Sequence, residues 1–337
     1  MKLLKVNNLI ICCSVLTFVF GITQNETEMV KANDQRSYYS EKILNEYKLR
    51  WVTIDEKTGE FVHHDESELP RPNISAYEGM TPSFNNFSID KRDKISSSVK
   101  GIVPPDDRSR IDPTDIGPYN STVKIEFGNN GDNGFCTGFL IGPRHVATAG
   151  HCLISGNGFR QDSIVVKPAL NGTQNDLNQN INGYLPYGSS SASIVAVGEE
   201  LLENGSNIGD WGILAMEYPL GNSIGWLGLR WQLFPYSSGT NVSLNGYTND
   251  SVNSIINYNF MYLSTGEVTG NDSFSKGLVT NLDSSGNQSG GPIYRYYNDT
   301  GYTAIAILRG GSNEIGNEYS DGRIIDYALY NLLISYR

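Results

Sequence analysis

From Tyr119 to the C-terminus, apolar and polar positions alternate in short runs that Gly, Asn, Asp and Pro separate. The runs include STVKIEF, GFLIGPRHVATAG, SIVAVGEE, WGILAME, NVSLNGY, MYLSTGEVTG, GPIYRYY and YTAIAILRGG. This pattern predicts an all-β fold, either a barrel or a sandwich. We find no alternation of helices with strands, which disfavours a doubly wound fold. The final segment, IIDYALYNLLISYR, has apolar residues at helical spacing and predicts one C-terminal helix.

The first hundred residues follow a different pattern. Two lysines precede a 14-residue apolar stretch ending at Ile22, which predicts a signal peptide over residues 1–23. A retained signal anchor is the alternative. Residues 24–100 are polar with little period-two pattern, and they predict a pro-segment and linker. Residues 101–337 would then form the mature domain.

The composition fits a β-rich protein, with 36 Gly, 20 Tyr and 39 % apolar residues. The formal net charge of −11 argues against a nucleic-acid partner, because phosphate binding needs a basic surface. Two of the four cysteines lie in the predicted signal peptide. The remaining pair, Cys136 and Cys152, most simply forms one disulfide in an oxidising compartment. No metal-ligand cluster stands out, and no cofactor is expected.

The sequence also predicts glycosylation. Asn-x-Ser/Thr sequons follow the predicted signal peptide, and in a secretory pathway many would carry glycans. They begin at Asn25, Asn73, Asn86, Asn120, Asn171, Asn204, Asn241, Asn249, Asn271, Asn287 and Asn298.

Candidate chemistry centres on Ser289 in SSGNQSGGPIY, where glycines allow a sharp turn and expose backbone N–H groups. A serine nucleophile needs a base and an orienting group. His151, beside Cys152 in a glycine-framed turn, is the candidate base, whereas His145 is better explained as an ordinary strand residue. Asp210 leads into an apolar strand, where it is either a turn cap or a functional carboxylate.

The three candidates occur in the order His151, Asp210, Ser289, which is the chain order of chymotrypsin-type triads. With TAGHC around His151, SGGP after the candidate nucleophile and DWGIL at Asp210, the chain resembles trypsin-like serine proteases. It is most similar to secreted bacterial-type glutamyl endopeptidases, through GIVPPDDRSRI, PYNSTVKIEF and STGEV. This resemblance covers residues 101–337.

The resemblance implies two six-stranded antiparallel β-barrels, roughly 101–230 and 231–337, with the active site between them. It implies that Ser289 attacks the scissile carbonyl, that His151 is the base and that Asp210 orients the imidazole. It further implies an oxyanion hole formed by the N–H groups of Asn287 and Ser289, and a substrate rim at Gly310 and Gly311.

Two positions just before the nucleophile depart from the family pattern. Gln288 replaces the Asp that pairs with a new N-terminal amine in trypsin, so a different activation route is expected, with cleavage after Lys100. Asn287 replaces a Gly, and Asn tolerates a left-handed backbone better than other residues with a side chain. A glycan on Asn287 would block the neighbouring nucleophile, so that sequon is expected to be unused.

The specificity pocket stays open on sequence alone. Leu308 stands where glutamyl endopeptidases have a His. Arg309 could receive an acidic substrate side chain if it points into the pocket. Asp283, six residues before Ser289, has the spacing of the acid with which trypsin binds Lys and Arg. Preference for Glu or Asp, for Lys or Arg, or for neither therefore remains possible on charge pairing alone.

The sequence predicts a secreted, monomeric serine endopeptidase that acts on proteins or peptides and needs no membrane after signal removal. One alternative is a catalytically inactive homologue that serves as a secreted binding glycoprotein. A serine esterase of another fold is a second alternative, but GNQSGG lacks the G-x-S-x-G elbow because Asn287 occupies the first glycine position.

Overall fold

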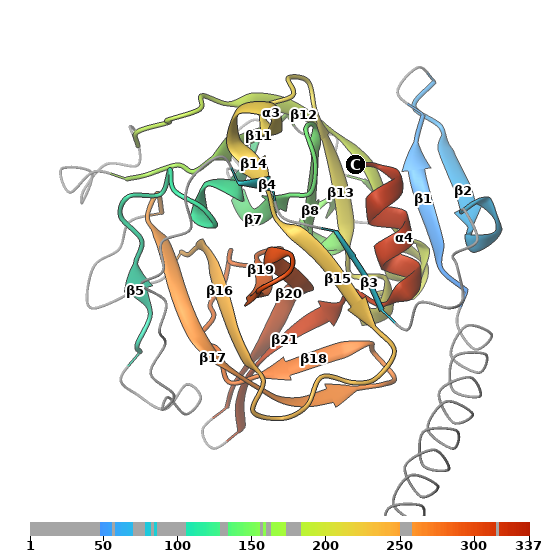
Figure 1. Ribbon diagram of the computed structural model, residues 1–337. Coiled ribbons are helices and arrows are strands. Elements are labelled where there is room, and N and C mark those ends of the chain that lie inside the picture. Colours follow the sequence, from blue (N-terminus) through green and yellow to red (C-terminus); the bar gives the residue numbers. More distant parts are fainter. Residues whose placement is uncertain are drawn as a thin grey trace, which may run out of the picture. The chain divides into compact units, whose positions relative to one another are not determined.

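The computed structural model describes the chain from residue 48 onward, with gaps (Figure 1). A compact body begins at Leu49 and runs to Arg337. The predicted signal peptide lies outside the described residues, and none of the helices described is long and apolar enough to span a bilayer. The described residues are 48–55, 58–69, 78–81, 84–85, 106–128, 134–155, 158–159, 163–172, 183–249, 258–314 and 317–337.

The first barrel is a closed ring of six strands in the order β11-β6-β7-β8-β13-β12, with β12 pairing back to β11. Alternate side chains point inward, so Val123, Ile125 and Phe127 of β6 are buried in its core. Its strands are β6 (Thr122–Gly128), β7 (Gly134–Leu140), β8 (His145–Thr148), β11 (Ser163–Pro168), β12 (Ser190–Gly198) and β13 (Gly212–Met216).

The second barrel closes in the order β16-β17-β18-β21-β20-β19, with β19 pairing back to β16. Leu244, Leu278 and Ile293 lie in its core. Each ring is antiparallel throughout, so the predicted pair of six-stranded barrels is confirmed. Its strands are β16 (Asn241–Tyr247), β17 (Met261–Asp272), β18 (Gly277–Thr280), β19 (Pro292–Tyr297), β20 (Gly301–Glu314) and β21 (Asn317–Ile324).

The predicted C-terminal helix is also confirmed as α4 (Tyr327–Ser335). Asp326 caps it by accepting the N–H of Leu329 at 3.0 Å. Leu329, Leu332 and Leu333 are buried. The other helices are α2 (Glu199–Asn204), α3 (Gly221–Ile224), η1 (Glu66–Glu68), η2 (Tyr119–Ser121), η3 (Gly150–Cys152) and η5 (Asn207–Gly209).

Several short strands are added to the two rings. The parallel neighbour of β20 is β15 (Gly228–Gln232), and β5 (Ser109–Arg110) pairs with β17. Two further pairs are β9 (Ile154–Ser155) with β10 (Gly158–Phe159), and β14 (Gly225–Trp226) with β4 (Phe84–Asn85). The remaining strands are β1 (Arg50–Ile54), β2 (Phe61–Asp65) and β3 (Glu78–Thr81).

The last three of these strands, with β4, fall in residues 24–100, where the sequence pattern predicted only a polar pro-segment and linker. In Figure 1, β1 and β2 form a hairpin beside α4. The sequence pattern did not predict β1 because Trp51 and Val52 are adjacent and both buried, so apolar and polar positions do not alternate along this strand.

Candidate active site

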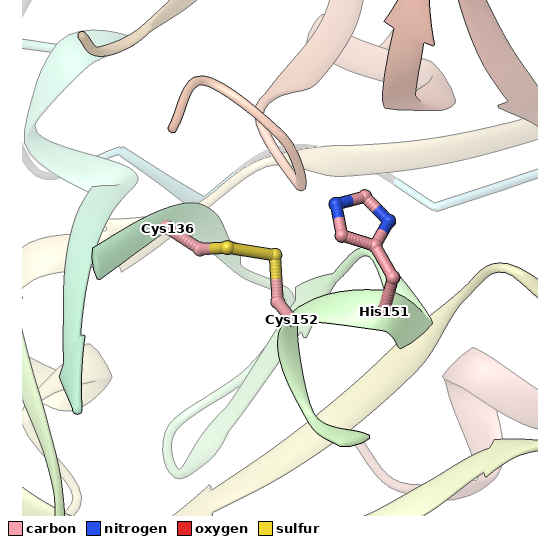
Figure 2. Close-up of side chains that lie close together, drawn as sticks. All are labelled: Cys136, His151 and Cys152. Atoms are coloured by element: carbon pink, nitrogen blue, oxygen red, sulfur yellow. A yellow bond between two sulfur atoms is a disulfide. The ribbon is translucent and has the colours of Figure 1, made fainter. Parts of the chain in front are cut away.

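His151 lies in the η3 turn that follows β8, and a disulfide anchors this turn. Cys152 is bonded to Cys136 of β7, as the two leftover cysteines predicted. Figure 2 shows the disulfide and the His151 side chain on this turn. Gly150 is required here, because a Cβ at that position would lie 2.8 Å from the carbonyl oxygen of Trp211. The turn is therefore pressed against the residue that follows Asp210.

Asp210 accepts two donors from His151. The imidazole Nδ1 lies 3.0 Å from Oδ1 and 2.9 Å from Oδ2, and the backbone N–H of His151 donates to Oδ1 at 2.9 Å. The acid is 6 % exposed. Because Nδ1 is engaged, Nε2 is the imidazole nitrogen left for proton transfer.

Ser289 lies on a loop that is hydrogen-bonded to the first barrel. Its carbonyl oxygen accepts the N–H of Thr137, the neighbour of Cys136, at 2.9 Å. Gly290 has φ +86°, and a Cβ there would overlap Thr137 and Thr148. The Ser289 hydroxyl donates to the carbonyl of Arg309 at 3.4 Å. No hydrogen bond joins it to the imidazole in the structure described, although such bonds are often long before substrate binds.

The backbone before Ser289 leaves two N–H groups without acceptors. Asn287 has φ +71°, the left-handed conformation that Asn tolerates. Among the residues described, neither the N–H of Asn287 nor that of Ser289 donates a hydrogen bond. The Asn287 side chain is held by Nδ2, which donates to the carbonyl of Phe135 at 2.7 Å. A glycan on Nδ2 would compete with this bond.

Gln288, between those two amides, is completely buried. Its Oε1 accepts the N–H of Ser285 at 2.9 Å and Nη1 of Arg108 at 3.3 Å. Nη1 of Arg108 also donates to Oγ of Ser285 at 2.9 Å, and Nη2 pairs with Asp106 at 2.6 Å. Arg108 is only 5 % exposed. Sequence analysis missed it, although an uncharged Gln288 called for a separate donor to hold this loop.

The guanidinium of Arg309, which the sequence left open as a pocket group, makes its contacts with other parts of the protein. A bulge in β20 between Leu308 and Gly310 reorients its side chain. Nη1 donates to the carbonyls of Asn207 at 2.6 Å and Ser275 at 2.8 Å, and Nη2 pairs with Asp321. At 7 % exposure, this guanidinium is committed to the protein interior.

Arg323, on β21 of the second barrel, is a second buried arginine that contacts the η5 turn. It is fully buried, and its Nε donates to the carbonyl of Ile208 at 2.8 Å while Nη2 pairs with Asp326 at 3.1 Å. Arg309 and Arg323 thus bind consecutive carbonyls of the η5 turn, three and two residues before Asp210. We call this pair the arginine clamp.

Asp283 is buried, and its Oδ2 accepts the backbone N–H of Asp107 at 3.0 Å. Burial and the neighbouring carboxyl of Asp107 raise the pKa of Asp283 to about 7.

The predicted substrate rim follows Leu308 and Arg309 on β20. Leu308 is buried, Gly310 faces open space and Gly311 is exposed, so the glycines are the accessible part of the predicted rim.

Cys136, His151 and Cys152 have ligand-type atoms within 4.8 Å of one another. The two sulfur atoms are bonded to each other, so they are not thiolate ligands in this state. His145 lies apart on β8, where burial lowers its pKa.

The arginine clamp predicts a large stability loss for Arg323→Met. Removing the guanidinium takes the donor from the carbonyl of Ile208 and the ion-pair partner from Asp326, and such losses at buried sites cost about 3–5 kcal/mol. Urea unfolding should show this decrease, whereas Arg295→Met, on partly exposed β19, should change the free energy of unfolding by less than about 1 kcal/mol. Equal effects of the two substitutions would contradict the clamp.

Asp283 predicts a pH dependence of stability. Because its native pKa lies above its ordinary value, it stabilises the fold below about pH 4, and this contribution is lost as the pH rises through about 7. In Asp283→Asn, the fall in Tm over that pH range should therefore be smaller by a few degrees, which corresponds to about 1–2 kcal/mol in the free energy of unfolding. Asp299→Asn, at an exposed turn, should leave the profile unchanged. An unaltered profile in Asp283→Asn would refute the assignment.

Comparison with known proteins places this site in a family. The chain matches the trypsin family over residues 110–322. It is 31 % identical over 259 residues to a Bacillus subtilis protein named extracellular metalloprotease, covering 76 % of this chain and 74 % of that protein. It is 27 % identical over 249 residues to the glutamyl endopeptidase of Bacillus licheniformis, covering 72 % and 71 %.

A solved structure of a Glu endopeptidase in complex with MPD has the same fold. It superposes with a TM-score of 0.56 at 21 % identity, covering 70 % of this chain and 98 % of that one. The chain belongs to the trypsin family, as a chymotrypsin-fold serine endopeptidase related to the glutamyl endopeptidases.

Proposed function

We propose that this serine endopeptidase is secreted as a proenzyme and cleaves peptide bonds with a triad of His151, Asp210 and Ser289. The observation that carries the proposal is the hydrogen bonding of His151 Nδ1 to Asp210 on a turn that the disulfide ties to β7, the strand whose Thr137 also binds the Ser289 loop. The N–H groups of Asn287 and Ser289, which have no acceptor among the described residues, lie on this same loop. This combination supplies a base, an orienting acid and an anion site.

In the proposed reaction, Oγ of Ser289 attacks the scissile carbonyl carbon as Nε2 of His151 takes the hydroxyl proton. The carbonyl oxygen becomes an oxyanion, which the N–H groups of Asn287 and Ser289 bind. His151 then protonates the departing amine, leaving an acyl ester on Ser289. Water, deprotonated by His151, hydrolyses that ester and restores the serine. Asp210 stabilises the imidazolium in both steps.

Arg108 has a positioning role in this proposal. In trypsin-type activation a charged pair orders the loop before the nucleophile, but Gln288 carries no charge. Here Arg108 donates to both Gln288 and Ser285, and Gln288 in turn accepts the Ser285 amide. These contacts support the backbone that presents the two oxyanion amides. Because Arg108 is already in place in the full chain, the anion site does not depend on a new N-terminus.

The substrate preference is proposed from what remains available at the pocket. Arg309 is committed to the clamp, so it is not the group that receives an acidic side chain. Asp283 is hydrogen-bonded to Asp107 and has a raised pKa, which weakens it as an anchor for Lys or Arg at neutral pH. We therefore propose that neither residue dictates specificity through a simple ion pair.

Secretion and processing rest on the leader. The signal peptide over residues 1–23 and cleavage after Lys100 lie outside the described residues and remain proposals. Of the predicted sequons, Asn204, Asn241 and Asn298 are exposed, whereas Asn120 is completely buried and donates to the carbonyl of Ile224. Glycans are expected at exposed sites of this kind.

The proposed function is tested with the secreted protein and its Ser289→Ala variant. Both are incubated with a peptide library, and the cleaved bonds are identified by mass spectrometry. Wild type should cleave peptides and bind a fluorophosphonate probe covalently, while the variant loses about a millionfold in kcat and is not labelled. Correctly processed wild type that neither cleaves nor labels would instead support the inactive binding homologue.

Arg108 is tested by Arg108→Met. We expect kcat to fall about ten- to hundredfold while KM changes less, because the oxyanion amides act mainly in the transition state. Arg110→Met, two residues along and more exposed, is the matched control. Arg108→Lys should recover part of the lost kcat, since it keeps one cationic donor. A fall in kcat no larger than that of Arg110→Met would show that Arg108 does not position the loop.

A further inference from the structure

The leader hairpin, described over residues 49–55 and 58–65, extends the first barrel. Its strand β1 pairs antiparallel with β12, aligning Trp51 with Gly198, Val52 with Val197 and Thr53 with Ala196. On the other side β1 pairs with β2 along its whole length. The hairpin thus pairs with residues 196–198 of β12, in addition to the pairing of β12 with β11 and β13. An uncovered strand of this kind would expose unpaired N–H and C=O groups.

The hairpin also contributes to the apolar core. Leu49 is completely buried, Trp51 is 4 % exposed and Val52 is 1 % exposed. Val52 belongs to the same apolar cluster as Val197 and Leu214 of the first barrel. Burying a large apolar side chain contributes about 1.5–3 kcal/mol. Such burial is characteristic of a permanent structural element.

Packing is less complete at the turn end of the hairpin. A hollow of about 780 Å³ lies there, lined by Ile54 and Phe61 of the hairpin and by Phe159 and Ile164 of the barrel. Phe61 itself is 49 % exposed. The attachment is therefore concentrated at residues 49–52, next to α2.

Charge attaches the hairpin to α2 at this end. Arg50 pairs with Glu199 at 2.9 Å and with Glu203 at 3.0 Å, and its Nε lies 3.8 Å from Glu200. His63 Nδ1 lies 2.7 Å from the other oxygen of Glu199. Three carboxylates on a six-residue helix therefore converge on one guanidinium. Removing it would leave like charges close together, including the largely buried Glu199.

The helix α2 leads directly to the catalytic acid of the proposed triad. It is followed by η5 and then by Asp210, and the N–H of Gly198, at the start of α2, donates to the carbonyl of Trp211 at 3.4 Å. The arginine clamp holds η5 from the second barrel, and the hairpin holds α2 from the opposite side of the segment. The segment 199–210 is thus supported at both ends.

We propose that the leader hairpin is a permanent partner of the protease and remains bound after the pro-segment is cut. The mature enzyme would then consist of two chains, with the fragment containing residues 49–65 seated on β12 and α2. There it positions Asp210 through the segment 199–210. This inference rests on the proposed cleavage after Lys100.

The composition of the active enzyme tests retention. Secreted protein is purified by size exclusion under native conditions, and its active fraction is analysed by intact-mass spectrometry and N-terminal sequencing after denaturation. We expect the peak with protease activity to contain residues 49–65, as a separate fragment beside the chain starting at Gly101. Active enzyme free of residues 49–65 would overturn the inference while leaving the proposed triad intact. Loss of the triad function would appear separately, as activity that survives Ser289→Ala.

A charge reversal tests the positioning role. Arg50→Glu should lower kcat about tenfold with little change in KM, because Asp210 is displaced without altering the substrate rim. Lys48→Glu makes the same charge change two residues away, outside the contact with α2, and should leave kcat unchanged. The double variant Arg50→Glu/Glu199→Arg should recover kcat in part. Equal kcat values for Arg50→Glu and Lys48→Glu, or no recovery in the double variant, would refute this role.

Discussion

The structure depends most on the arginine clamp between the two barrels. A buried guanidinium is tolerated only when acceptors surround it, and Arg309 and Arg323 find theirs in carbonyls of the η5 turn together with Asp321 and Asp326. Because the bound carbonyls lie two and three residues before Asp210, the need to satisfy two buried charges also constrains where the acid lies. The imidazole of His151 is then oriented by Asp210, so its geometry follows from contacts made on the second barrel.

The Ser289 loop is held by neutral and charged groups together. In the trypsin-type arrangement one buried ion pair orders this loop, but here the completely buried Gln288 accepts hydrogen bonds from Ser285 and Arg108. The loop is also tied to the first barrel through Thr137, next to the Cys136–Cys152 disulfide. The groups proposed for catalysis therefore converge because β7, the disulfide and the loop share one set of contacts.

The β1–β2 hairpin of the leader is part of the same sheet as the first barrel. An eight-stranded sheet contains the six barrel strands and the β1–β2 hairpin, so part of the polar N-terminal region is structurally continuous with the protease body. Its arginine pairs with the glutamates of α2, and its Val52 belongs to the apolar core of the first barrel. In a chain whose net charge is −11, such local neutralisation matters for a helix carrying three glutamates.

The sequence by itself determined the all-β architecture, the C-terminal helix, the Cys136–Cys152 disulfide and the family, because alternation, helical spacing and short motifs are local properties. It also nominated His151, Asp210 and Ser289 from their motifs and chain order, and it allowed the left-handed backbone now seen at Asn287. Only the tertiary structure decided the roles of Arg108 and Arg309 and the place of the leader hairpin. The partners of Arg108 and Arg309 lie up to about 180 residues away, and a bulge in β20 at Arg309 interrupts the strand register there. Trp51 and Val52 are buried together by contacts with distant strands, which no local periodicity can encode.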